Sequence, residues 1–193
     1  MRRDASNGYE DVADAFIRVR SSAGVDVVRA WAAGLPRGGT VLDVGAGSGE
    51  PLSVALAEAG LRVSAVDAAP SMAAAFRRRL PGAPIACEPA ERSRFFGRRF
   101  NGVLAVGLVF LLPAHAQPAL IRRLAGALMP GGRLLFSAPK QTGAWTDLLT
   151  GRRSASLGAA GYGRAIARAG LRFLGDRTDE QGNAYYAARR RPG

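Results

Sequence analysis

The chain has little cysteine, lysine or histidine, and it has no long apolar segment. Its single cysteine, Cys87, cannot form an intrachain disulfide, which favours a reducing compartment. The longest apolar run, Gly102–Ala114, is well short of the roughly 20 residues that span a bilayer. The first ten residues, MRRDASNGYE, lack the apolar core of a signal peptide. These shortages predict a soluble, cytoplasmic protein without membrane association.

Negative charge is scarce as well, since 15 acidic residues stand against 27 basic ones and leave a net charge of +12. Lys140 is the only lysine, so nearly all the positive charge is arginine. The arginines occur as pairs and triplets spread along the chain, at 77–79, 98–99, 122–123, 152–153 and 189–191. We interpret this spread as a solvated surface. A basic chain attracts acidic partners at low salt, so nucleic acid stays open as an alternative partner.

The length of 193 residues suits one well-buried core. Segments typical of strands and helices alternate along most of the chain, which predicts a doubly wound α/β sheet. The expected strands are 40–44, 61–67, 84–87, 102–106 and 133–137, and 171–176 and 184–188 form a closing antiparallel hairpin. The expected helices are 9–20, 24–33, 51–60, 70–80, 117–128 and 162–169. Residues 138–160 show no clear period and are predicted to form a long ordered loop with partial helix.

The stretch VLDVGAGSGEPL, residues 41–52, places an aspartate in a buried strand and follows it with three glycines. Glycine lets the backbone turn sharply and lets a ligand approach without a Cβ in the way. A dinucleotide fold requires G-x-G-x-x-G, but Glu50 stands at the third position and Asp43 would repel a pyrophosphate. An acid at Asp43 suits a ligand that carries an ammonium and a sulfonium. Asp67, which ends the second strand, can accept both hydroxyls of a ribose.

These segments resemble the class I S-adenosylmethionine-dependent methyltransferases. VLDVGAGSGEPL is similar to their first motif and VSAVDAAPSM to their second. AERSRFFGRRFNGVLAVGLVFLL resembles the third-strand loop with the fourth strand, and LIRRLAGALMPGGRLLFSAP resembles the helix, turn and fifth strand that follow. The resemblance covers about residues 41–139. It implies an α/β fold with a doubly wound, Rossmann-like sheet of seven strands. The sheet is expected to be mostly parallel, with the antiparallel hairpin at the C-terminus and helices on both faces.

The resemblance also implies the cofactor, S-adenosylmethionine, and its product, S-adenosylhomocysteine. It assigns the methionine part to the first motif, the ribose to the second, the adenine to the second and third, and the methyl-donor pocket to the end of the fourth strand. In that order the residues are Asp43, Gly45, Ala46 and Gly47; Asp67; Met72, Ala90 and Glu91; and Val106 and Gly107. Ala68, which follows Asp67, is also expected to bind the cofactor. We expect one domain over residues 1–193, divided into an N-terminal helical cap (1–35), a cofactor-binding core (40–139) and a substrate-side segment (140–193).

The resemblance leaves the acceptor open, and we expect a small molecule, anionic ones included. No Asn/Asp-Pro-Pro-Tyr/Phe motif follows the fourth strand, and Cys87 lies too early to resemble the nucleophile of the pyrimidine C5 enzymes. The N-terminal helix and the loop after the fifth strand cover the pocket in similar enzymes. The catalytic candidates are His115, as a general base, and Tyr9, and the substrate candidates are Arg18, Arg20, Trp145 and Tyr162. Each of these also fits an ordinary surface or core role, and no metal is expected.

Two other functions stay open at this point. An RNA or protein methyltransferase would use the arginine-rich surface, and a non-catalytic scaffold would bind S-adenosylmethionine without transferring its methyl group. Both are compatible with the motifs, because methyl transfer needs no single catalytic side chain that a sequence must show. Either a monomer or a homodimer is expected.

Overall fold

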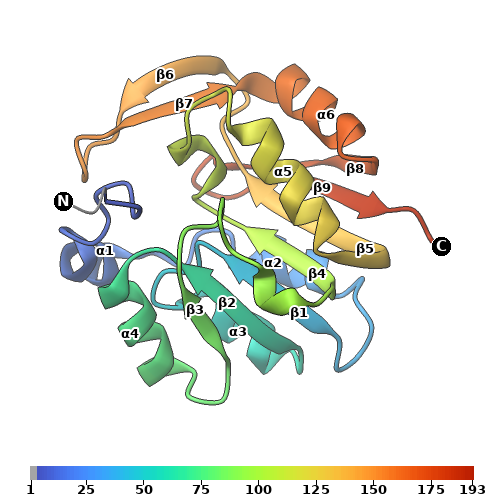
Figure 1. Ribbon diagram of the computed structural model, residues 1–193, viewed down its shortest axis with the longest axis horizontal. Coiled ribbons are helices and arrows are strands. Elements are labelled where there is room, and N and C mark those ends of the chain that lie inside the picture. The colour runs from blue at the N-terminus through green and yellow to red at the C-terminus, as the bar shows by residue number, and fades with distance from the viewer. Residues whose placement is uncertain (1–3) are drawn as a thin grey trace.

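The computed structural model describes residues 4–193, which are built around one seven-stranded sheet (Figure 1). The first five strands of the sheet are parallel, and β9 runs antiparallel to both β5 and β8. The prediction of a mostly parallel, seven-stranded sheet with an antiparallel C-terminal hairpin is confirmed. Residues 1–3 of the predicted cap, 1–35, lie outside the described residues. In spatial order the strands are β3 (Ile85–Cys87), β2 (Arg62–Asp67), β1 (Thr40–Val44), β4 (Phe100–Ala105), β5 (Leu128–Ser137), β9 (Ala184–Arg190) and β8 (Leu171–Thr178).

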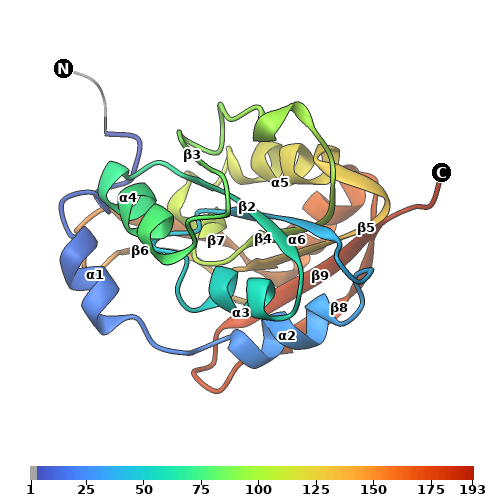
Figure 2. The same ribbon diagram turned by 90° about the horizontal axis from the view of Figure 1, so that it is seen from below.

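Helices cover both faces of the sheet. Figure 2 shows α2 and α3 on one side and α5 on the other. None of the helices within residues 4–193 is both long and apolar enough to cross a membrane. The helices are α1 (Ala13–Val19), α2 (Val25–Ala32), α3 (Leu52–Glu58), α4 (Pro70–Arg79), α5 (Gln117–Gly126) and α6 (Gly158–Arg168), with short 3₁₀ turns η1 (Phe95–Gly97) and η2 (Val109–Leu111).

Each face of the sheet has its own hydrophobic core. On one face Trp31 of α2, Leu56 of α3 and Phe76 of α4 pack together with strand residues. On the other face Leu124 of α5 and Ile166 of α6 are fully buried. Strand β1 supplies both cores, because four of its five residues are buried. This two-sided burial is typical of a central parallel strand and explains why TVLDV has so few polar residues.

The segment predicted as a long loop, residues 138–160, instead forms a second, two-stranded sheet and the start of α6. Strands β6 (Thr142–Thr146) and β7 (Arg153–Leu157) pair antiparallel. The five residues of β6 are all exposed, so no buried face imposes the apolar alternation that marks a strand in a sequence. The prediction was wrong here because the pairing satisfies backbone hydrogen bonds without burying much apolar surface.

The first helix begins later than predicted, at Ala13 rather than Tyr9. The Asp4 carboxylate accepts hydrogen bonds from the backbone N–H groups of Ser6, at 2.9 Å, and Gly8, at 2.6 Å. These bonds hold residues 4–12 in turns, since an aspartate side chain competes with helical backbone bonding. The helix therefore begins only after these turns, at Ala13.

The fifth strand begins at Leu128 rather than Arg133. The expected turn at Pro130–Gly132 lies inside it, because the pairing with β4 shifts register between Phe100 and Gly102. The carboxyl end of β5 is unaffected by this irregularity.

Candidate functional site

The carboxyl ends of β1 and β4 lie where the strand order reverses, and a cavity of about 1000 Å³ opens there. Open α/β sheets bind ligands at this switch point. The loop after β1 contributes Gly45 and Gly47, whose φ angles of +74° and +57° favour glycine. A Cβ built on Gly45 would lie 3.1 Å from the Leu108 side chain. Because neither glycine has a Cβ, a ligand can approach the backbone closely at this part of the cavity wall.

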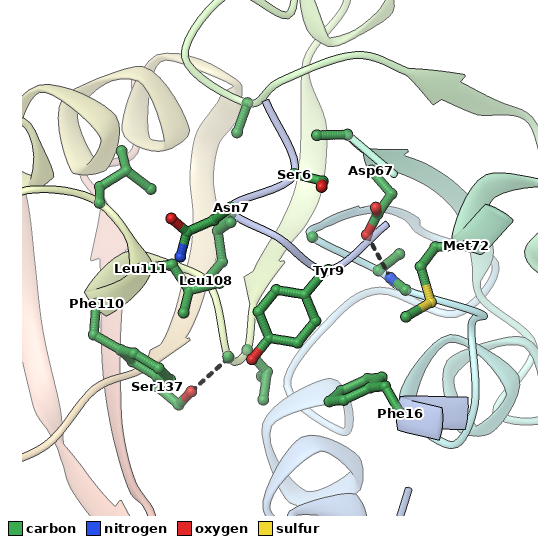
Figure 3. Close-up of a pocket in the computed structure, with 18 of the residues that line it drawn as sticks. Ser6, Asn7, Tyr9, Phe16, Asp67, Met72, Leu108, Phe110, Leu111 and Ser137 are labelled. Carbon is green, nitrogen blue, oxygen red and sulfur yellow. Dashed lines mark hydrogen bonds between the residues drawn. The ribbon is translucent and has the colours of Figure 1, made fainter. Parts of the chain in front are cut away.

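Asp67, at the end of β2, is fixed by the same loop. One carboxylate oxygen accepts the backbone N–H of Gly47 at 2.7 Å, which Figure 3 shows as a dashed line, and the other accepts the backbone N–H of Ala69 at 2.9 Å. Burial raises the pKa of the Asp67 carboxyl, although these two hydrogen bonds act in the opposite direction. Asp67 lines the cavity, and its carboxylate can accept further hydrogen bonds besides the two from the backbone, so it can bind a ligand there.

Ten of the eleven predicted cofactor residues line this one cavity. Met72 is 2% exposed and lies beside Asp67 in Figure 3, and Ala90 and Glu91 come from the loop after β3. The ten are Gly45, Ala46, Gly47, Asp67, Ala68, Met72, Ala90, Glu91, Val106 and Gly107. Segments at the carboxyl ends of four strands, β1, β2, β3 and β4, thus converge on one cavity, where the resemblance implied one ligand.

Asp43 is the exception, because its side chain does not line the cavity. It is 3% exposed and accepts a hydrogen bond from Ser53 Oγ at 2.6 Å, beneath the glycine loop. Burial raises the pKa of Asp43 to about 6, and the Ser53 hydrogen bond and the nearby Arg20 lower it less. In this structure the Asp43 carboxylate ties β1 to α3, and its predicted contact with the methionine part stays a prediction.

The segment that matches known proteins includes the glycine loop, Asp67 and Met72, which line the cavity. Residues 41–132 match a family described as a methyltransferase domain. A segment of 98 residues is 42% identical to the cypemycin N-terminal methyltransferase of Streptomyces sp., and the match covers 49% of this chain and 40% of that protein. Residues 41–132 carry a methyltransferase domain. The chain matches well under two thirds of that relative's length.

Two solved structures extend the likeness of the fold to nearly the whole chain. The 1,6-didemethyltoxoflavin-N1-methyltransferase of Burkholderia thailandensis superposes with a TM-score of 0.76 at 22% identity, over 95% of this chain and 84% of that one. The CcbJ methyltransferase of Streptomyces caelestis gives a TM-score of 0.78 at 16% identity, over 98% of both chains. The methyltransferase fold thus includes the segments outside residues 41–132, the N-terminal segment and the C-terminal hairpin among them.

The N-terminal segment lies across the cavity of the methyltransferase domain and is attached at both sides. Toward α4, the Glu10 carboxylate accepts the backbone N–H of Ser71 at 2.9 Å and its hydroxyl at 2.7 Å. Toward the turn between β6 and β7, Tyr9 donates to Asp147 at 3.4 Å, and Arg152 lies 3.8 Å from Asp4. Tyr9 lines the cavity, as Figure 3 shows.

The part of the methyltransferase cavity beyond the glycine loop has an apolar wall and a polar wall. Leu108, Phe110 and Leu111 follow β4 and form the apolar wall. On the polar side Ser137 ends β5, and its hydroxyl oxygen accepts the Gly107 N–H at 2.8 Å (Figure 3). Tyr185, which pairs with Ser137 across β5 and β9, also lines the cavity.

Arg20 lines the cavity with Tyr9, whereas the other four predicted acceptor or catalytic residues do not. His115 and Arg18 are exposed and do not line it. Tyr162 is fully buried in the core and donates to Gln117 at 2.9 Å, which corrects its prediction as a pocket wall. Trp145 does not line the cavity, and its ring packs on that of Phe110, which does, with the two centroids 5.7 Å apart.

The sequence analysis missed several cavity residues, which it had no local pattern to reveal. Asn7 and Phe16 come from the N-terminal segment and α1, and Asn183 and Tyr185 come from the β8–β9 turn and β9. Among the cavity residues, only the apolar ones after β4 could have been found from the sequence, because an apolar run that continues past the end of a strand has to pack against another part of the protein or a ligand. Within residues 4–193 no three His, Cys, Asp or Glu side chains are grouped as metal ligands.

Proposed function

We propose that the chain binds S-adenosylmethionine in this cavity and transfers its methyl group to a small-molecule acceptor. The observation that carries the proposal is Asp67, held by the backbone of the glycine loop and still facing the cavity. A carboxylate at the end of the second strand, beside a loop without Cβ atoms, suits a ribose and the chain that extends from it. Both features lie inside the segment that matches the methyltransferase family.

Each part of the cofactor then has its own residues. Asp67 accepts the ribose hydroxyls, and Met72 and Ala68 pack against the adenine with Ala90 and Glu91 at its edge. The methionine part lies over Gly45–Gly47, and Val106 and Gly107 line the methyl-donor pocket. These assignments are supported by the common cavity that the residues line.

Arg20 is our candidate for the methionine carboxylate. It lines the cavity, its guanidinium carbon lies 5.3 Å from the centre of the Phe16 ring, and within residues 4–193 it forms no ion pair with a carboxylate. Burial lowers the pKa of Arg20, against the opposing effect of Asp43. A partly buried guanidinium suits a carboxylate ligand, which it can bind with two parallel hydrogen bonds.

When bound, S-adenosylmethionine supplies an electrophilic methyl carbon. The contribution of the chain is alignment and the exclusion of water, and alignment alone lowers a barrier by roughly 7–11 kcal/mol. Tyr9 lies in the cavity, and burial raises its pKa to about 12, so its hydroxyl is protonated at neutral pH. His115 lies outside the cavity. We therefore propose an acceptor atom that can attack the methyl group without first giving up a proton to a side chain of this protein.

The size of the cavity supports a small acceptor. Ligand pockets range over about 300–1,000 Å³ for drug-sized molecules, and a cavity of about 1000 Å³ has room for the cofactor together with a second small molecule. A peptide N-terminal amine is the second candidate acceptor, because the relative at 42% identity is named an N-terminal methyltransferase. The exposed strand β6 leaves one edge near the cavity for an extended chain.

The experiment that tests the proposal is calorimetric titration with S-adenosylmethionine, S-adenosylhomocysteine and, separately, NAD. We expect binding of one equivalent of each of the first two, with a Kd on the order of micromolar, and no binding of NAD. Binding of NAD alone would overturn the proposal. Incubation with methyl-labelled S-adenosylmethionine and panels of small amines, phenols and short peptides then separates the two acceptor classes. A protein that binds the cofactor but labels nothing supports the scaffold alternative.

We also propose a cytoplasmic location and either a monomer or a homodimer. Cys87 is an exposed free thiol, a state that a reducing compartment preserves. For the domain organisation, we propose that the cap (1–35), the core (40–139) and the substrate-side segment (140–193) fold together as one unit. Light scattering after size exclusion distinguishes the oligomeric states.

A further inference from the structure

A second cavity, of about 650 Å³, lies at the amino end of β2, the strand whose carboxyl end holds Asp67. Strand β3 pairs with β2 only at Ala65–Asp67, and Pro84, the residue before β3, has no N–H with which to extend the pairing. Residues 62–64 of β2 therefore have no partner strand on this side, and they line the cavity together with residues 80–84. Within residues 4–193 no residue lines both this cavity and the methyltransferase cavity, so the two are separate.

The guanidinium of Arg98, which lines this second cavity, is held in place by other side chains. Its Nη2 atom donates to Ser64 Oγ at 2.6 Å. Its central carbon lies 5.1 Å from the centre of the Phe100 ring and 5.8 Å from that of Phe96, distances at which a cation is attracted to an aromatic face. Arg98 follows a turn in which Phe95 and Phe96 have φ angles of +48° and +58°, a region that phenylalanine rarely adopts. The protein therefore fixes this cation without the help of a ligand.

The second cavity carries positive charge without a carboxylate to balance it. Arg62 lines it as well as Arg98, and within residues 4–193 its lining contains no aspartate or glutamate. Neither arginine forms an ion pair with a carboxylate in the described part of the chain. Both residues are exposed, so a ligand from solvent can reach them, and Arg98 has further N–H groups besides the one that Ser64 accepts. The pair suits an anion, because a guanidinium can bind a carboxylate through two parallel hydrogen bonds.

The rest of the wall of the second cavity is mostly aliphatic. Leu61 precedes β2, Leu80 follows α4, and Ala83 lies in the segment that leads to β3. Within residues 4–193 no aromatic side chain lines this cavity. Apolar walls with a few fixed polar groups are typical of small-molecule sites, in which the polar groups set the orientation of the ligand. A hydrocarbon chain fits this wall better than a flat ring system, which packs best on aromatic side chains.

We propose that this second cavity is a binding site for a small aliphatic carboxylate. Arg98 and Arg62 bind the carboxylate group, and the hydrocarbon chain packs on Leu61, Leu80 and Ala83. The site lies outside the methyltransferase cavity, so the inference does not depend on the proposed methyl transfer. Affinity comes from the charged hydrogen bonds together with the apolar area removed from water, so an anion without a chain and a chain without a charge both bind less well.

The test uses octanoate as the probe and the full chain, with and without saturating S-adenosylhomocysteine. Changes in backbone amide chemical shifts, followed by NMR during titration, give both the location of the probe and its Kd. We expect shifts at residues 62–64, 82–83 and 98, and a Kd on the order of 1 mM, as befits a small fragment. Acetate and inorganic phosphate lack the chain and octanamide lacks the charge, so each should bind about tenfold more weakly.

Two outcomes of the titrations would overturn the proposal. Displacement of octanoate by S-adenosylhomocysteine would place the probe in the methyltransferase cavity instead. Inorganic phosphate that binds as tightly as octanoate would show that the site takes anions without an aliphatic part. Failure of S-adenosylhomocysteine to bind, with octanoate shifts intact at residues 62–64, would contradict the proposed methyl transfer and support the independence of the second cavity.

Variants of the two arginines test their roles. Arg98→Gln removes the fixed cation and should raise the Kd for octanoate about tenfold, whereas Arg98→Lys keeps the charge without the paired hydrogen bonds and should raise it about threefold. Arg62→Gln changes an exposed residue and should also raise it about threefold, which keeps the test valid if Arg98→Gln disturbs the fold.

Arg78→Gln is the matched control for the arginine variants. It makes the same change of charge on α4, where Arg78 is exposed and lines neither cavity. We expect its Kd for octanoate to stay within about twofold of the wild type. An equal rise of the Kd in Arg78→Gln and Arg98→Gln, or no rise in Arg98→Gln and Arg62→Gln, would overturn the assignment of the carboxylate to this cavity.

Discussion

Two parts of the cavity are built in different ways: the proposed cofactor half, around the glycine loop and Asp67, and the proposed acceptor half, beside Tyr9 and the turn between β6 and β7. In the cofactor half Asp67 accepts two backbone N–H groups at 2.7 and 2.9 Å, from residues no more than 20 positions away in the chain. In the acceptor half Tyr9 reaches Asp147 at 3.4 Å across 138 positions, and Arg152 reaches Asp4 at 3.8 Å. Charged hydrogen bonds to the backbone are strong and geometrically fixed, whereas exposed side-chain pairs contribute little.

The difference shows how one scaffold serves many acceptors. The cofactor half stands on buried strands and on glycines that admit few substitutions, so its shape changes little. The acceptor half consists of a terminal segment and the turn of an exposed hairpin, which can vary without disturbing either core. Ligand-binding segments of this kind come from the less stable parts of a protein. Substitutions in the two halves should therefore have effects of different size on stability and on cofactor affinity.

Substitution of Gly49 should cause the largest loss. Gly49 has a φ of +85°, and a Cβ there would lie 2.9 Å from the buried Phe76 ring. We expect Gly49→Ala to lower the free energy of unfolding by about 3 kcal/mol, through the left-handed backbone and the overpacking together. Urea denaturation measures it. Gly82→Ala is the control, since a Cβ at Gly82 meets nothing within 4 Å, and an equal loss there would contradict this explanation.

Substitution of Asp67 should affect the cofactor rather than the fold. Asp67→Ala removes a charged hydrogen-bond acceptor, so we expect the Kd for S-adenosylmethionine to rise about 100-fold in calorimetry. Asp67→Asn, which keeps one oxygen, should show a smaller loss of about tenfold. Thermal unfolding of the two variants serves as the control for structure. Unchanged affinity in Asp67→Ala would remove the ribose assignment.

Asp43 should make stability fall as pH rises. Burial raises its pKa in the folded chain from 3.8 to about 6, so between these values the folded state holds a proton that the unfolded state has lost. Stability is thus favoured at pH 4 and decreases by about 2 kcal/mol by pH 7 through this group alone. Asp43→Asn should remove that decrease, as measured by unfolding at both pH values. Parallel pH profiles of variant and wild type would show that Asp43 keeps an ordinary pKa.

Asp147 should give the smallest effect. Asp147→Ala removes a long, partly buried hydrogen bond from Tyr9 and three hydrogen bonds within its own turn, from the Leu149 N–H, the Thr150 N–H and the Thr150 hydroxyl. We expect less than about 1 kcal/mol of lost stability and no change in S-adenosylmethionine affinity. Hydrogen exchange should rise in residues 4–12 and 147–152 only. Faster exchange in the glycine loop would mean that the two halves are coupled after all.

Several features followed from the sequence alone because they depend on neighbours in the chain. The alternation of strand and helix segments was enough to predict the sheet, and the glycines after TVLDV and Asp67 at the next strand end marked two of its loops, whereas the other predicted cavity residues came from the resemblance of the motifs to the methyltransferase family. Parallel strands connected by helices place their carboxyl ends at the same edge, so residues at those ends meet without further information.

Other features were decided only by tertiary structure. Asn7, Ser137 and Tyr185 line one cavity although they are far apart in the chain, and no local pattern marks them. Strand β6 escaped prediction because all its residues are exposed. The same limit applied to Asp43 and Tyr162, whose residue types suit a ligand but whose positions in the fold gave them partners within the protein. Local periodicity reports which residues are buried in an element, and only the packed chain determines what each side chain faces.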